Sequence, residues 1–365
     1  MIFQDVYRGR RVFVTGHTGF KGAWLSEWLL QLGADVGGLA LLPQTNPSLF
    51  DLLKHERRIS SHHISDVRCY EPIAELLGEF KPEIVFHLAA QPLVRRSYDH
   101  PKETFDTNVG GTVNILEAIR HTPTVKAAVI VTTDKVYQNR ENLLGYRESD
   151  PLGGDDPYSA SKAASEVVAH SYIRSFFARK PTTANIATAR AGNVFGGGDW
   201  SPDRIVADCA RAWLERRSVV IRNPDAIRPW QHVLDCLSGY LWLGVNLWTA
   251  REEATGEAFN FGPPASANQC VLSLVKEFTK TWPHASWQFA ADCSTTKRET
   301  NRLLLNTDKA ERQLNWMSTL DFVSSVAITS QWYRSYLSHD PIQLTQVQIE
   351  DYQGRAKNQN RLWAR

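Results

Sequence analysis

The stretch Arg11-Val-Phe-Val-Thr-Gly-His-Thr-Gly-Phe-Lys-Gly22 decides the fold. It places three glycines between an apolar run, residues 11–15, and a segment whose apolar residues recur at helical spacing up to Leu32. Glycines at Gly16, Gly19 and Gly22 permit a tight turn and let backbone N–H groups approach a pyrophosphate at the helix N-terminus. The alternative is a glycine-rich turn without a ligand. The strand-like and helical flanks favour a dinucleotide site.

The same alternation of strand and helix continues along the first half of the chain. Further strands are expected at residues 36–41, 84–88, 126–132 and 185–190, with helices around 105–119 and 160–178. This order predicts an α/β fold with a doubly wound parallel sheet.

The character of the sequence changes after about Arg190. Ten of the 12 tryptophans lie beyond it, and glycine and proline break the chain into shorter segments. We expect residues 1–190, with about 230–262, to form the dinucleotide-binding domain. About 191–229 and 263–365 should form a smaller, mixed α/β substrate domain. The part after Asp340 is polar without clear periodicity and is expected to be a surface extension.

Composition excludes several classes of function. The 365 residues carry 41 Lys+Arg against 39 Asp+Glu, and no basic stripe predicts a nucleic-acid partner. No apolar stretch predicts a membrane span, and no signal peptide is expected. Five widely spaced cysteines predict reduced thiols, and so a cytoplasmic protein. The adjacent pair His62 and His63 does not match a metal-ligand spacing, so no metal is predicted.

The cofactor is expected to be NAD. The segment Leu39-Ala-Leu-Leu-Pro43 has no acidic residue to hold an adenosine ribose, and no arginine for the 2′-phosphate of NADP. Asp66 is the candidate for the adenine edge. Its alternative role is that of a solvated loop carboxylate.

Tyr158 and Lys162 are the candidates for proton transfer. They stand at i, i+4 on one helix face, where the ammonium group favours the phenolate, and they predict a proton acceptor near neutral pH. A chance Tyr-x-x-x-Lys is common, but this pair follows a strand that ends in Thr133-Asp134-Lys135, at the ligand-binding edge of a parallel sheet. The alternatives are a strand-end hydroxyl for Thr133 and a turn cap for Asp134.

Together these residues resemble the extended short-chain dehydrogenase/reductases that act on nucleotide sugars. The resemblance covers nearly the whole chain and includes His87-Leu-Ala-Ala90, Asn108-Val-Gly-Gly-Thr112, Arg190-Ala-Gly-Asn-Val194 and Arg228-Pro-Trp-Gln-His-Val233. It implies a Rossmann-type sheet and a hydride-transfer triad. Thr133 would bind the sugar C4 oxygen, Tyr158 would take its proton, and Lys162 would hold the nicotinamide ribose.

The resemblance also implies binding residues and an assembly. NAD would contact Gly16, His17, Gly19, Phe20, Lys21, Gly22, Asp66, Leu88, Ala89, Ala90, Asn108, Tyr158 and Lys162. The nucleotide sugar would contact Gln91, Asn193, Arg204, Arg228 and Arg302. A homodimer or a dimer of dimers would form through the helices at 105–119 and 160–178. The alternative is that these helices only cover the sheet.

The residues after Thr133 indicate which reaction of the family to expect. An acid at Asp134 is similar to the 4,6-dehydratases of the family, and Asp134 would protonate the leaving C6 hydroxyl. Relatives that act on dTDP-glucose carry Asp-Glu, whereas this chain has Asp134-Lys135. With His17 and Lys21, this departure is most similar to members that act on CDP-glucose. Lys135 would act as a neutral base at C5, as a fixed charge, or as a solvated loop lysine.

Three other functions stay open. They are a nucleotide-sugar 4-epimerase, a dehydratase for another nucleotide sugar, and a catalytically idle NAD-binding regulatory protein.

Overall fold

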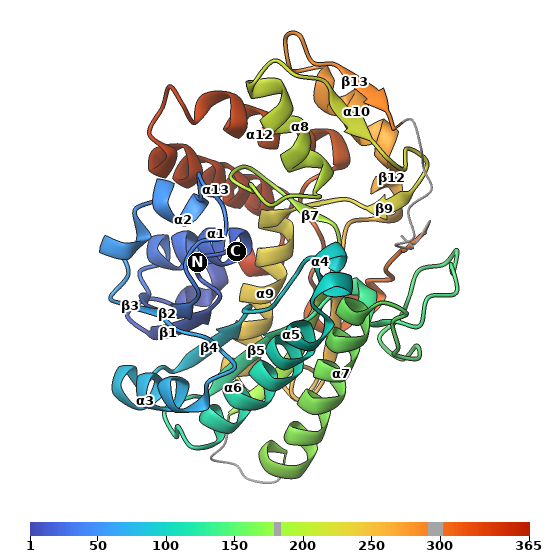
Figure 1. Cartoon of the computed structure of the whole chain (residues 1–365). Coiled ribbons are helices and arrows are strands. Elements are labelled where there is room, and N and C mark those ends of the chain that lie inside the picture. Colours follow the sequence, from blue (N-terminus) through green and yellow to red (C-terminus); the bar gives the residue numbers. More distant parts are fainter. Residues whose placement is uncertain (179–183, 291–301) are drawn as a thin grey trace.

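The computed structural model describes residues 1–178, 184–290 and 302–365. Its centre is a seven-stranded sheet in the order β11-β6-β5-β4-β1-β2-β3, and every pairing in it is parallel (Figure 1). The strands are β1 (Arg11–Thr15), β2 (Asp35–Ala40), β3 (Ser61–Ile64), β4 (Ile84–His87), β5 (Ala127–Val131), β6 (Asn185–Ala191) and β11 (Ala258–Phe261). The predicted Rossmann-type, doubly wound sheet is confirmed.

Successive side chains of each strand point to opposite faces of this sheet, and both faces are buried. Val12 and Val14 of β1 belong to a core shared with α1 (Phe20–Gln31) and α9 (Val233–Trp248). Phe13 belongs to the opposite core, which is covered by α3 (Tyr70–Phe80), α6 (Gly111–Arg120) and α7 (Pro157–Tyr172). Helices therefore cover both faces, and only the sheet edges and strand ends are left for a ligand.

The two long predicted helices differ from the structure at their ends. The first is divided into α5 (Pro101–Phe105), the π-helical turn η3 (Asp106–Gly110) and α6. The second begins at Pro157, because Asp156 caps the backbone N–H of Ser159, and it continues into the π-helical turn η5 (Ile173–Phe177).

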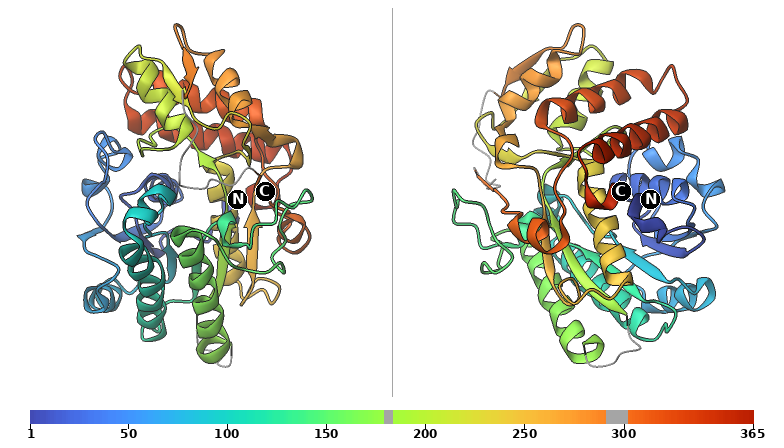
Figure 2. Two further views of the ribbon diagram at one scale, coloured as in Figure 1. Left: turned by 45° about the vertical axis from the view of Figure 1, so that its right-hand side comes forward. Right: turned by 180° about the vertical axis from the view of Figure 1, so that it is seen from behind.

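The remaining elements lie mainly above the carboxyl ends of the strands (Figures 1 and 2). Three two-stranded pairs join β7 (Val194–Phe195) to β10 (Gln231–His232), β9 (Ile227–Pro229) to β12 (Asn268–Cys270), and β8 (Val219–Ile221) to β13 (Trp287–Phe289). The helices of this part are α8 (Ile205–Leu214), α10 (Val271–Thr279) and α12 (Phe322–Ser335). We call it the upper part; the exact division of the chain into domains stays a prediction.

Short elements complete the chain. They are α2 (Leu49–Leu52), α4 (Val94–Asp99), α11 (Asp308–Leu314) and the 3₁₀ turns η1 (Ile2–Asp5), η2 (His55–Arg57), η4 (Asp134–Val136), η6 (Ala265–Ala267) and η7 (Leu362–Ala364). In the part of the chain that the structure describes, no helix is both long enough and apolar enough to cross a bilayer.

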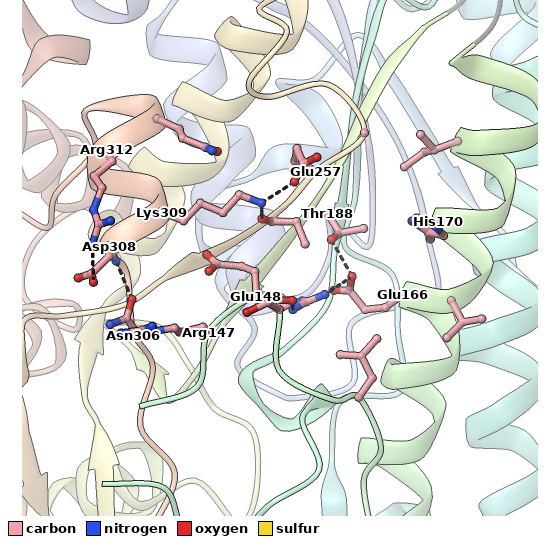
Figure 3. A pocket seen from close by; sticks show the side chains of 18 residues that line it. Arg147, Glu148, Glu166, His170, Thr188, Glu257, Asn306, Asp308, Lys309 and Arg312 are labelled. Atoms are coloured by element: carbon pink, nitrogen blue, oxygen red, sulfur yellow. Dashed lines mark hydrogen bonds and ion pairs between the residues drawn. The ribbon is translucent and has the colours of Figure 1, made fainter. Parts of the chain in front are cut away.

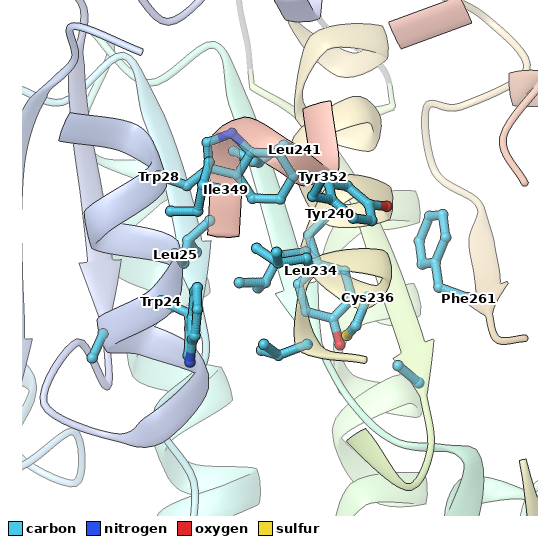
Figure 4. Packing of buried hydrophobic residues seen from close by; sticks show 14 of the residues in the cluster. Trp24, Leu25, Trp28, Leu234, Cys236, Tyr240, Leu241, Phe261, Ile349 and Tyr352 are labelled. Carbon is cyan, nitrogen blue, oxygen red and sulfur yellow. The ribbon is translucent and has the colours of Figure 1, made fainter. Parts of the chain in front are cut away.

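The expectation of a polar surface extension after Asp340 is wrong. Residues Pro341–Asn358 form α13, which packs on α1 and α12 (Figure 2, right). Its buried stripe is Thr345, Ile349, Tyr352 and Ala356, spaced by helical turns, but only one of these is a strongly apolar aliphatic residue. Figure 4 shows Ile349 and Tyr352 beside Trp28 of α1. A stripe built from threonine, tyrosine and alanine does not stand out from a polar sequence.

Candidate active site

The turn between β1 and α1 has the form that a dinucleotide needs. Gly16 has φ +77°, and a Cβ there would lie 2.8 Å from the backbone nitrogen of Ala89. A Cβ on Gly22 would lie 2.1 Å from the carbonyl oxygen of Gly16, so the turn closes only with glycines. Gly19 begins α1 without a side-chain cap. The helix start is therefore open to an anion, and these residues fit the pyrophosphate of NAD.

The two unusual residues of this turn point in different directions. His17 is fully buried at the end of β2, where its ring lies 2.7 Å (Nε2 to Nδ1) from His62 in the space left by Gly38. Burial, aided by His62, lowers the pKa of His17 to about 3, so its ring is neutral. Lys21 extends toward the hydroxyl of Tyr240 at 3.4 Å, and burial lowers its pKa.

Asn108 and Gln91 make hydrogen bonds that hold the segment after β4. Asn108 accepts from the Gln91 backbone N–H at 2.8 Å and donates to Ser161 on α7 at 2.8 Å. The Gln91 side chain bonds Leu93 and Thr104. The structure therefore places Gln91 outside the substrate cavity described below, because its amide is used within its own loop. Leu88, Ala89 and Ala90 remain beside the glycine turn, where Ala89 N donates to Thr15.

Asp66 lies in the loop after β3 and is occupied by its neighbour. Its carboxylate accepts from the backbone and the guanidinium group of Arg68, at 2.9 and 2.6 Å. These bonds hold the pKa of Asp66 below its usual value. Its role at the adenine edge stays a prediction.

The predicted triad is brought together at the ends of β5 and α7. Tyr158 lies close enough to Thr133 for the threonine hydroxyl to lower the pKa of Tyr158 against the effect of burial, and Lys162 Nζ donates to the carbonyl of Val131 at 3.1 Å. Burial raises the pKa of Tyr158 to about 12, and burial with the charge of Lys21 lowers that of Lys162 to about 7. The protein groups alone therefore do not make Tyr158 the proton acceptor near neutral pH that was expected.

Asp134 and Lys135 follow Thr133 on the short turn η4. The Asp134 carboxyl is fully buried; its Oδ1 accepts from Thr133 at 3.0 Å, and its Oδ2 has no hydrogen-bond partner among the described residues. Lys135 Nζ lies 3.7 Å from Asp134 Oδ1, and its side chain is 27% exposed. Lys135 thus faces the cavity, with the carboxyl held behind it.

A cavity of about 350 Å³ lies between these residues and the upper part. It brings together predicted catalytic, substrate-binding and cofactor-binding residues. The catalytic ones are Thr133, Asp134, Lys135 and Tyr158, the substrate-binding ones are Asn193, Arg204 and Arg228, and the cofactor-binding ones that also line it are Phe20, Lys21 and Tyr158. Arg204 donates to Asp199 at 2.7 Å. Arg302 does not line the cavity, but an isolated bridge to Ile227 sets its backbone beside the strand of Arg228.

Sequence reasoning missed the far end of this cavity. There Asp203 accepts from Arg222 at 2.6 Å and lies 3.9 Å from Arg95. These residues come from three separate segments without a common motif, so only the tertiary fold brings them together.

A larger cavity of about 670 Å³ holds Glu166 and Arg190 (Figure 3). Arg190 donates two bonds of 2.9 Å to the buried carboxylate of Glu166, which also accepts from Thr188 at 2.7 Å and from Thr132. Every group of this ion pair is satisfied. None of the residues predicted to react lines this second cavity, so the chemistry belongs to the smaller one.

The described cysteines are free, and no metal cluster is found in the described part of the chain. Cys69, Cys209, Cys236 and Cys270 are free thiols, while Cys293 lies outside the described residues. No group of three or more His, Cys, Asp or Glu side chains among residues 1–178, 184–290 and 302–365 could hold a metal ion.

A dinucleotide site, a tyrosine, a lysine and a polar cavity therefore lie together at one edge of the sheet. This fold and this site define an enzyme of the extended short-chain dehydrogenase/reductase class. The family model for GDP-mannose 4,6 dehydratase matches residues 13–329, and the chain belongs to that family.

Similar sequences and a similar solved structure indicate which members of the family the chain resembles. The chain is 43% identical over 359 residues to a CDP-glucose 4,6-dehydratase from Salmonella typhimurium, covering 96% of this chain and 98% of the relative. It is 26% identical to dTDP-glucose 4,6-dehydratase 1 of Escherichia coli over 89% of this chain and 93% of that protein. The solved structure of DesIV, a dTDP-glucose 4,6-dehydratase from Streptomyces venezuelae with NAD and TYD bound, has the same fold, with a TM-score of 0.74 and 24% identity over 89% of this chain and 97% of that one.

Proposed function

We propose that this chain is a CDP-glucose 4,6-dehydratase, which uses NAD to convert CDP-glucose into CDP-4-keto-6-deoxyglucose and water. The observation that carries the proposal is the placement of Asp134 and Lys135 directly after Thr133 inside the substrate cavity. The similarity to the Salmonella enzyme supports the cytidine nucleotide. A 4-epimerase has no need for an acid and a titratable base at this point.

The triad carries out the oxidation at C4. Thr133 hydrogen-bonds the C4 oxygen, and Tyr158 takes the hydroxyl proton as the C4 hydrogen leaves as hydride. When bound, NAD would supply the hydride acceptor for this oxidation and the hydride donor for the reduction at C6. Lys162 holds the ribose of the cofactor and adds positive charge near Tyr158 when protonated.

Asp134 and Lys135 carry out the elimination. The ketone at C4 makes the C5 proton acidic. Lys135 either takes this proton as a neutral base or, as a fixed charge, stabilises the enolate oxygen while another group or water takes the proton. The C6–O bond then breaks, and Asp134 gives its proton to the leaving hydroxide, which becomes water. A proton returns to C5 as C6 receives its hydride, so the net change is the loss of water.

The substrate is held by charge and by hydrogen bonds at its diphosphate. Arg204 and Arg228 line the cavity, and Arg302 lies next to the strand of Arg228. Guanidinium groups suit phosphate oxygens because they donate charge-assisted bonds. Asn193 also lines the cavity, and its buried Oδ1 has no partner among the described residues, which leaves it available to a ligand.

One assay separates the candidate functions. Purified enzyme with NAD is mixed with CDP-glucose, dTDP-glucose, UDP-glucose and GDP-mannose, and the products are tested for the chromophore that 4-keto sugars give in alkali. We expect the chromophore only with CDP-glucose. A changed C4 configuration without it would identify an epimerase, and no turnover of any sugar would leave the idle regulatory protein.

We also propose that two copies of the chain associate through α6 and α7. These helices lie side by side on one face of the sheet (Figure 1), and Val167 on α7 and Phe176 on η5 are 60% and 43% exposed. Light scattering should give a dimer or a dimer of dimers; a monomer at micromolar concentration would contradict this. The free thiols and the requirement for NAD support a cytoplasmic location.

A further inference from the structure

The carboxyl of Asp134 lies in a space that exists because residue 192 has no side chain. A Cβ built on Gly192 would lie 1.8 Å from Asp134 Oδ2 and 2.2 Å from its Cγ. Real atoms do not approach this closely, so any other residue at 192 must displace the carboxyl or the backbone.

The backbone of Gly192 does not itself require glycine. Its φ lies outside the positive range, so an alanine could adopt the same conformation. This separates Gly192 from Gly16, where φ is +77°. What requires glycine at 192 is the neighbouring side chain alone.

Hydrogen bonds and the sheet register hold both partners in this close approach. Gly192 follows β6, and its carbonyl oxygen accepts from the buried Gln231 side chain at 3.0 Å, which also bonds Phe261 at 2.9 Å. Asp134 follows the adjacent strand β5, and its Oδ1 is held by Thr133 at 3.0 Å. The register of β5 and β6, which sets Val131 beside Ala189, fixes the two strand ends relative to each other.

We propose that Gly192 is a positioning residue for the dehydration: its missing side chain creates the space in which Asp134 holds its carboxyl beside Thr133 and Lys135. The inference rests on the proposed function, in which Asp134 protonates the leaving C6 hydroxyl. A carboxyl displaced by about 1 Å would still leave Thr133, Tyr158 and Lys162 to oxidise C4, but it would no longer meet the C6 oxygen.

The experiment uses the full chain with NAD and CDP-glucose and compares wild type with Gly192→Ala. We expect kcat to fall roughly tenfold to a hundredfold, the loss that a small misplacement of a reacting group causes. KM should change far less, because the substrate-binding arginines are untouched. Reduced cofactor should accumulate, seen by its absorbance, because oxidation outruns elimination. A general loss of structure would not produce this accumulation.

A double-mutant cycle isolates the contact. In an Asp134→Gly background the atoms that meet the new Cβ are gone, so adding Gly192→Ala should not lower the thermal midpoint further, whereas it should lower it in the wild-type background. Gly78→Ala on α3 is the matched control, since a Cβ there has no atom within 4 Å. This cycle measures the contact between residues 134 and 192 through thermal midpoints, even if the Gly192→Ala enzyme is too unstable for an activity assay.

The outcomes separate the two ideas. Wild-type turnover in Gly192→Ala, with turnover lost in Asp134→Asn, overturns the role of Gly192 and leaves the proposed function intact. Equal losses of thermal midpoint in both backgrounds also overturn it. Wild-type turnover in Asp134→Asn removes Asp134 from the reaction and overturns the role of Gly192, whereas the proposed function itself fails only if the wild-type enzyme does not turn over CDP-glucose.

Discussion

Lys135 is the residue whose charge state decides how the C5 proton leaves. We expect Lys135→Ala and Lys135→Met to retain C4 oxidation and to accumulate reduced cofactor, while elimination slows by orders of magnitude. If the lysine is the base, small amines should restore C5 proton exchange with a dependence on their pKa. If it acts by charge, amine basicity should not matter. Wild-type turnover in both variants would exclude it from the mechanism.

Lys162 connects the active site to stability through pH. Its pKa is about 7 in the folded protein, because of burial and the charge of Lys21, against about 10.4 in an unfolded chain. Between these values the unfolded state binds more protons, so this group makes the free energy of unfolding rise with pH, by at most about 1.4 kcal/mol per pH unit. Urea unfolding of the cofactor-free protein between about pH 7.5 and about pH 8.5 should show that the free energy of unfolding increases with pH. Lys162→Met should show a smaller rise, because only the contribution of the buried Lys21 then remains.

The end of β2 is occupied by His17 where a carboxylate would hold the adenosine ribose. Together with the buried Lys21, this arrangement predicts that NAD is readily lost. Dialysed protein should have little activity and should regain it when NAD is added. Protein that retains a full complement of NAD after dialysis would refute the prediction.

Among the elements, α13 shows how a buried helix escapes a sequence reading. We expect Ile349→Ala to cost about 2–5 kcal/mol, because the fully buried side chain packs against the core and leaves a cavity. Val347 lies two residues earlier on the same helix but is 45% exposed, so Val347→Ala should cost less than about 1 kcal/mol. Urea unfolding of both variants checks the difference. Equal and small losses would mean that α13 is the loose extension first expected.

Elements with a local signal were predictable, and contacts between distant segments were not. Residues 11–22 specify their strand, turn and helix through apolar periodicity and glycine, and Tyr158 with Lys162 follows from helical spacing and the position after β5. The bonds that the Gln91 amide makes with Leu93 and Thr104 could not be predicted, and its contact with the sugar stays a prediction. The space that Gly192 leaves for Asp134 was also beyond reach, since it depends on two strand ends that lie about sixty residues apart in the sequence.

For the whole molecule, we expect the hydride to stay within one active site during the reaction. The net reaction changes no oxidation state of the cofactor, so the hydride taken from C4 should return to C6 of the same sugar. Substrate deuterated at C4, mixed with unlabelled substrate, should give product deuterated at C6 without crossover, measured by mass spectrometry. Label found in product from the unlabelled substrate would show that reduced cofactor or sugar escapes.

The path of the backbone limits how this site admits its substrate. After β6 the chain leaves for the upper part, comes back as α9 and β11, leaves again for α10, and finally returns to α1 as α13. Several backbone connections therefore join the sheet to the upper part, and a wide hinge opening would have to bend all of them at once. We therefore expect the substrate to enter through small movements of the residues that line the cavity. A fragment ending at residue 190 would lack α9, and the sheet side chains beneath that helix would be exposed to water.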